Sequence, residues 1–148
     1  MHSRTMIAPF FNTKRMETVK KNEVVLEKAF QIIPLIITTA NEVVKKTTET
    51  KIYHDKIVGL YGSATSDFGI INSTIELSID EKEVFPELFE ASLINRQVGV
   101  NINELPYKIE RKAKNSKVKI TYTDGGNVNA IYPYTYNLYL VAETATSK

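Results

Sequence analysis

The rest of this chain must pack against one segment, which reads LEKAFQIIPLIITTANEVV from Leu26 to Val44. Apolar residues recur in it at spacings of three and four, which draws one stripe along a helix of 3.6 residues per turn. The stripe comprises Leu26, Phe30, Ile33, Ile37, Ala40 and Val44. Further apolar residues widen it, so we expect a sheet to cover one side of this helix and a neighbouring subunit another.

The predicted helix extends from about Thr13, whose hydroxyl can cap the first turn, to Lys46, where a cation suits the negative end of the helix dipole. Pro34 interrupts it, because proline removes one backbone hydrogen bond and clashes with the preceding turn, at a cost of ~3 kcal/mol. We therefore expect a kink there. The β-branched residues within 32–39 leave a buried strand as the alternative.

After this helix the apolar period changes to two, as in a strand with one buried face. Two strands are predicted, Thr47–Tyr61 and Phe68–Ile79. Helical spacing returns over Asp80–Gln97. A hairpin then joins Lys117–Thr123 to a long strand through the turn Asp124–Asn127, whose residues suit positive φ.

These elements predict one α+β domain, residues 13–143, in which the long kinked N-terminal helix and a second helix pack on one face of a mainly antiparallel sheet. An extended apolar arm, residues 1–12, precedes the domain, and a loose tail, residues 144–148, follows it. A chain of 148 residues with 43% hydrophobic and 24% charged residues fits one folded domain.

No pattern in the chain identifies a reaction. The sequence has no cysteine, which excludes disulfides, thiolate metal sites and cysteine nucleophiles. His54 and Asp55 lack a third catalytic group, and adjacent residues of a strand face opposite sides. The acidic residues after Asp80 are interpreted as a solvated helix face, and Gly125–Gly126 as a turn rather than a phosphate loop. We expect no catalytic, cofactor or metal site, no small-molecule substrate and no enzymatic activity.

A basic run is the sharper signal for a partner. It consists of Lys108, Arg111, Lys112, Lys114, Lys117 and Lys119, opposed only by Glu110. Such a run could contact a phosphate backbone, although lysines near a hairpin also prevent strands from pairing at a sheet edge. The net charge of +2 adds little to the argument for DNA.

Several apolar and aromatic residues are expected to form a subunit interface, because tyrosine suits surfaces that are half buried. They are Ile7, Phe10 and Phe11 of the arm, Ile33 and Ile37 of the helix, and Tyr132, Tyr134 and Tyr136 of the last strand. The expected partners are copies of the chain and neighbouring structural proteins.

In its order of elements, the chain resembles small virion proteins of tailed bacteriophages, of the tail-terminator, neck and head-completion types, in which a helix precedes a sheet and the chain closes on a long strand. The resemblance implies a symmetric oligomer in the virion, made in the host cytoplasm, whose basic run can face DNA. The alternative is a cytoplasmic, basic nucleic-acid-binding accessory protein. The apolar runs are shorter than the ~20 residues of a membrane span, and Met1–Phe11 lack the core of a signal peptide, so no membrane partner is expected.

Overall fold

The computed structural model describes residues 24–95 and 107–147. The chain divides into two compact units, Lys28–Thr144 and a smaller one made of Met1–Glu27 with Ala145–Lys148. In the smaller unit the Thr146 hydroxyl donates to the carbonyl of Val25 at 3.3 Å.

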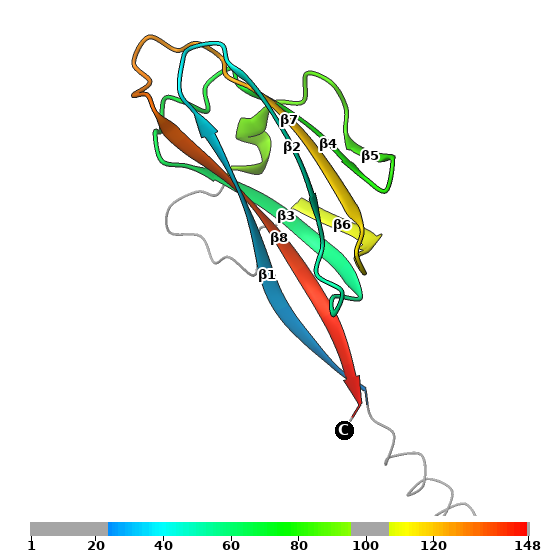
Figure 1. Ribbon diagram of the computed structural model, residues 1–148. Coiled ribbons are helices and arrows are strands. Elements are labelled where there is room, and N and C mark those ends of the chain that lie inside the picture. The colour runs from blue at the N-terminus through cyan, green and yellow to red at the C-terminus, as the bar shows by residue number, and fades with distance from the viewer. Residues whose placement is uncertain (1–23, 96–106, 148) are drawn as a thin grey trace, which may run out of the picture. The chain divides into compact units, whose positions relative to one another are not determined.

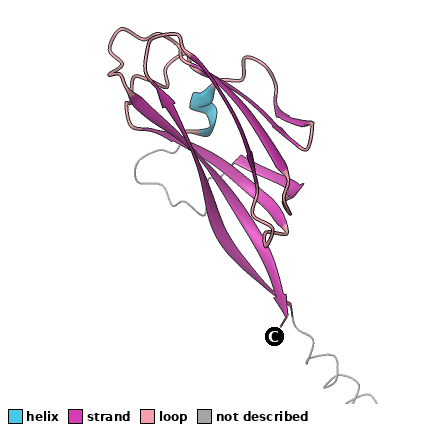
Figure 2. Ribbon diagram, viewed as in Figure 1, coloured by secondary structure: helices cyan, strands magenta, loops and turns pink. Residues whose placement is uncertain are grey.

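The described residues form strands almost throughout (Figure 2). One short 3-10 helix, η2 (Ala91–Ile94), is the helical exception in those ranges. The strands are β1 (Val24–Ile37), β2 (Val43–Glu49), β3 (Lys56–Ala64), β4 (Thr74–Ile79), β5 (Lys82–Phe85), β6 (Tyr107–Lys112), β7 (Lys117–Thr123) and β8 (Tyr134–Ser147).

The strands lie in two four-stranded sheets (Figure 1). The first sheet has the order β1-β8-β3-β6 and the second the order β2-β7-β4-β5. The first strand therefore pairs with the last, the second with the seventh, the third with the sixth, and the fourth with the fifth. This is a long antiparallel ribbon, folded back at the β4–β5 turn and rolled so that β8 also meets β3 and β7 meets β4. An eight-stranded sandwich wound in this way is a jelly roll.

The predicted α+β class is wrong, and the long N-terminal helix is its largest error. Of the predicted helix Thr13–Lys46, residues 24–46 are described, and they form strand β1, a turn and the start of β2. Ile33, Leu35 and Ile37 are buried, whereas the residues between them are exposed, which is a period of two. Almost every residue from 32 to 37 is apolar, so apolar spacing cannot separate the two periods. The β-branched residues and Pro34, which an edge strand tolerates, decide for the strand, which was the alternative.

The second predicted helix is also wrong. Asp80 and Glu81 have φ values of 51° and 66°, so they form the tight two-residue turn between β4 and β5. After β5 the described part of Asp80–Gln97 contains only η2, and residues 96–97 lie outside the described ranges.

The predicted strands are confirmed in part. Thr47–Tyr61 divides into the end of β2 and the start of β3, which belong to different sheets. Phe68–Ile79 is strand only from Thr74, where the predicted face holds, because Ile75, Leu77 and Ile79 are buried. The second strand of the predicted hairpin, β8, starts after Pro133 and continues through the expected loose tail to Ser147. Its first strand, β7, is confirmed, but the two strands lie in different sheets and form no hairpin.

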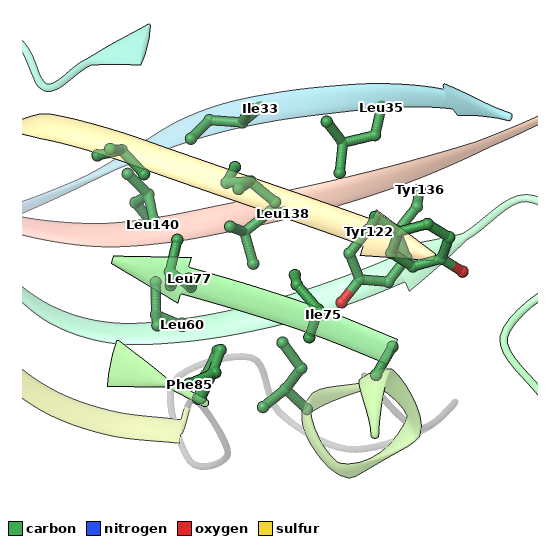
Figure 3. Packing of buried hydrophobic residues seen from close by; sticks show 14 of the residues in the cluster. Ile33, Leu35, Leu60, Ile75, Leu77, Phe85, Tyr122, Tyr136, Leu138 and Leu140 are labelled. Carbon is green, nitrogen blue, oxygen red and sulfur yellow. The ribbon is translucent and has the colours of Figure 1, made fainter. Parts of the chain in front are cut away.

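The core fills the space between the sheets (Figure 3). Alternate residues of β1, β3 and β8 meet alternate residues of β4, β5 and β7, and each central side chain is almost wholly enclosed. The largest of the enclosed side chains include Leu35, Leu60, Ile75, Leu77, Phe85, Ile120, Tyr122, Tyr136 and Leu138. Each sheet thus buries one face in the core, so any binding surface must lie on the outer faces, the edges or the ends of the sandwich.

Candidate interaction site

The outer face of the first sheet carries a row of apolar side chains along β1. Phe30, Ile32 and Ile36 are 46%, 53% and 61% exposed, at the alternate positions that point away from the core. Pro34, between the two isoleucines, is also exposed. Exposed apolar side chains at successive positions along one face of a strand are unusual for a surface that contacts only water.

Aromatic rings extend this row across the sheet. Tyr139 of β8 stands opposite Tyr61 of β3, and their rings stack with centroids 4.6 Å apart. Phe30 meets Tyr61 edge to face at 6.5 Å. Phe30, Ile32, Pro34 and Ile36, which are exposed, are called the outer apolar face from here on; Tyr61, only 4% exposed, and the half-buried Tyr139 adjoin it.

The second sheet presents a different outer face. On β4 the outward residues are Thr74, Glu76 and Ser78, and on β7 they are lysines and threonines. On β2 the outward positions alternate through Val43, Lys45, Thr47 and Glu49. Val43, 53% exposed, is the one large apolar side chain among them. The difference between the two faces shows that the outer apolar face is not a general property of this sandwich.

The open edge of β1 is partly blocked. Pro34 has no amide hydrogen, and its carbonyl accepts a hydrogen bond from Lys46 Nζ at 2.9 Å. Gln31 binds the backbone at the end of β2 and just after it, donating to Glu49 O at 2.9 Å and accepting from Lys51 N at 3.2 Å. A proline and side-chain contacts along an edge oppose the addition of another strand, so the face of β1 is more available to a partner than its edge.

The described residues predicted as interface do not form an exposed surface. Ile33, Ile37, Tyr134 and Tyr136 are at most 2% exposed and belong to the core, and Tyr132 is half buried against it. Ile7, Phe10 and Phe11 lie outside the described residues. The exposed apolar surface is supplied instead by Phe30, which the predicted helix placed in the same stripe as Ile33, and by Ile32 and Ile36, which it placed beside that stripe.

The basic run does not form one surface. Lys108 and Lys112 are on the outward side of β6 in the first sheet, whereas Lys117 and Lys119 are on the outward side of β7 in the second. Two of its members are in ion pairs, Lys114 with Asp55 at 3.2 Å and Lys119 with Glu81 at 2.8 Å. Arg111, at an inward position, lines a cleft.

A buried network around Asp124 was not foreseen from the sequence. The carboxylate is 3% exposed and accepts hydrogen bonds from the amides of Asn41 at 3.0 Å and Gly126 at 2.9 Å, and from the hydroxyls of Tyr132 at 2.6 Å and Tyr134. Tyr122 Oη lies 3.0 Å from Tyr134 Oη. The network joins the β1–β2 turn, the β7–β8 loop and the start of β8. The only hint in the sequence was an aspartate beside two glycines.

The pKa values follow from this geometry. Burial acts to raise the pKa of Asp124, but the tyrosine hydroxyls and the two amides outweigh it and hold the pKa below its ordinary value. The hydrogen bond to Asp124 raises the pKa of Tyr132 to about 12. Burial, reinforced by Asp124, raises the pKa of Tyr134. Because it accepts these four hydrogen bonds, the carboxylate of Asp124 acts as a structural anchor and not as an acid or base.

The lowered pKa of Asp124 predicts a loss of stability in acid. A carboxylate whose pKa is lower in the folded state than its unfolded value of ~3.9 stabilises the fold above that pH, and this contribution is lost as the pH falls through the folded pKa. We expect urea unfolding to show that the stability advantage of the native chain over Asp124→Asn shrinks from pH 5 to pH 2.5. An advantage independent of pH would contradict this role for the carboxylate.

The other residues considered from sequence are His54 with its neighbour Asp55, and the pair of glycines after Asp124. His54 is 2% exposed, and burial and then the charge of Lys51 lower its pKa, while Asp55 is paired with Lys114. Gly125 and Gly126 lie in the β7–β8 loop, and Gly126 has a φ of 67°, as a turn requires. In the described ranges no group of three acidic or histidine side chains could hold a metal ion.

Comparison of the chain with protein-family models, with curated proteins and with solved structures found no match. Within residues 24–95 and 107–147, no helix is long and apolar enough to cross a membrane. Function must therefore be argued from the surfaces described above.

Proposed function

We propose that this protein is a non-enzymatic structural protein that assembles with copies of itself, as a component of a virion, through the outer apolar face. The exposed row of Phe30, Ile32 and Ile36 carries the proposal, because the second sheet has no such row among its described residues. Burying apolar surface is worth roughly 25 cal/mol per Å², so a face of this kind favours association. Jelly rolls occur in viral capsids, but also in lectins and cupins, so the fold alone is a weak argument.

The structure weakens the support for two finer expectations, a position in the neck or tail of a phage and binding to nucleic acid. A position in the neck or tail of a phage followed from a helix preceding a sheet, an order that the described residues do not have. The nucleic-acid alternative needs one basic surface, and the lysines of the basic run point from opposite sides of the sandwich. The proposal therefore stays with assembly in a virion, without a named position.

A charge placed on the outer apolar face tests the proposal. We expect the native chain to form a discrete oligomer in native mass spectrometry and sedimentation velocity, and Ile36→Asp to raise its dissociation constant at least about 100-fold, because an aspartate would be buried unpaired at the contact. Val43→Asp is the matched control, since Val43 is similarly exposed on the outer face of the second sheet. A native chain that stays monomeric at tens of micromolar contradicts the proposal, and so does equal weakening by both variants.

A further inference from the structure

The two sheets leave a cleft on the side opposite β1 and β2, between the edge strands β5 and β6. Its volume is about 310 Å³. The lining residues come from the β4–β5 hairpin and from the end of β6, and all but one are charged. They are Ile79, Asp80, Lys82, Glu110, Arg111 and Lys112.

The two acidic residues of the cleft are already engaged. Asp80 accepts a hydrogen bond from the amide of Lys117 at 2.8 Å, and its pKa is lowered by hydrogen bonds from Ser116 and that amide. Glu110 pairs with Lys56 at 3.2 Å. Neither acid forms an ion pair with Lys82, Arg111 or Lys112 among the described residues.

Arg111 is poorly held for a guanidinium. Its Nε is buried and has no hydrogen-bond partner. Its two contacts are long, from Nη1 to Glu110 O and from Nη2 to Glu83 O, each at 3.4 Å. A buried donor without an acceptor destabilises the fold, and an oxygen of a bound ligand would remove that cost. Arginine offers a planar fork of donors that matches the oxygens of a phosphate or carboxylate.

We propose that the cleft between β5 and β6 binds a phosphate group, held by the fork of Arg111 and by the charges of Lys82 and Lys112. The three cations outnumber the two carboxylates of the cleft, although the charge of Lys82 also acts on Asp80 and helps to lower its pKa. The fork of Arg111 favours a phosphate, whose several oxygens can accept from it at once. The volume is in the lower range of small-ligand sites, which accommodates inorganic phosphate or the phosphate end of a monoester. This site is independent of the outer apolar face and of the assembly proposed for it.

Titration of the protein with inorganic phosphate, monitored by amide chemical shifts in NMR, tests the proposal. The ionic strength is held constant, because salt screens weak charge contacts. We expect saturable shifts concentrated in β5 and β6, and little shift with acetate. Arg111→Lys keeps the charge but loses the fork, and should raise the dissociation constant for phosphate about tenfold or more. Glycerol 3-phosphate distinguishes the two sources: tighter binding than phosphate indicates a monoester, and equal binding indicates the phosphate group alone.

Lys45→Gln is the control, because Lys45 is an exposed lysine of β2, at the opposite edge of the second sheet from β5. It should leave the phosphate titration unchanged. Lys82→Gln, at an exposed position, provides a second variant if Arg111→Lys fails to fold, and should weaken binding at least threefold. Each of three results would overturn the proposal: amide shifts spread over all lysines, an equal response to acetate, or an unchanged affinity for phosphate in Arg111→Lys.

Discussion

Replacing Asp124 with asparagine should lower the free energy of unfolding by about 3 kcal/mol. Asparagine keeps one acceptor oxygen and places an amide nitrogen, itself a donor, against the donors that now meet the carboxylate. Hydrogen bonds to a charged group are worth about 1.5–3 kcal/mol, and stranding their buried partners adds to the cost. Urea unfolding at pH 7 measures the change, as a shift in midpoint without a change in slope.

Asp67→Asn makes the same chemical change at an exposed aspartate in the β3–β4 loop. It should alter stability by less than about 0.5 kcal/mol. If Asp124→Asn were equally mild, the carboxylate would not be holding the loops together, and the pH dependence predicted above would fail with it.

Gly62→Ala should have an effect of similar size for a different reason. A Cβ on Gly62 would fall on the hydroxyl oxygen of Tyr136 and against the ring carbon that bears it. Tyr136 is 0% exposed, so its ring cannot swing into solvent. Forcing extra volume into a packed core costs about 1–3 kcal/mol, and we expect the upper end. Ser63→Ala, at the next position of β3, should be mild by comparison in thermal unfolding.

Tyr136→Phe makes this prediction sharper. The Tyr136 hydroxyl is buried without a hydrogen-bond partner, and burial raises its pKa. Removing the hydroxyl should therefore leave stability unchanged or raise it by about 1 kcal/mol. In the Gly62→Ala background it should recover only part of the loss, because the ring carbon still blocks the new methyl group. Full additivity of the two changes would show that the contact does not exist.

At β1 the sequence pattern predicted a helix, whereas the structure has a strand. Residues 32–37 are apolar at nearly every position, so they satisfy a helical stripe and an alternating strand equally well. What separated the two readings was local: Pro34 is costly in a helix and acceptable at a sheet edge. Where polar residues break the apolar run, as in β4, the period was unambiguous, and the buried face was assigned correctly. In β8 the alternation was also found, but its tyrosine face, predicted as a subunit interface, is buried in the core at Tyr134 and Tyr136.

Pairing between distant strands could not be derived from local patterns. β7 and β8 follow one another with a turn suited to a hairpin, yet the β7–β8 loop carries the chain from one sheet to the other. The connection between β6 and β7 also crosses between the sheets and separates Lys112 from Lys117, so a basic cluster in sequence is divided in space. The carboxylate of Asp124 accepts a hydrogen bond from Asn41, which lies 83 positions away in the chain. No sequence motif predicts this contact.

The pairing of β1 with β8 also orders events during synthesis. β8 occupies the place between β1 and β3, and it is the last of the described strands to be made. While the ribosome is still completing β8, the apolar residues of β1 have no neighbour in their own sheet, and contacts so distant in sequence form late. Until β8 has emerged, the nascent chain therefore leaves its first described strand open to wrong association.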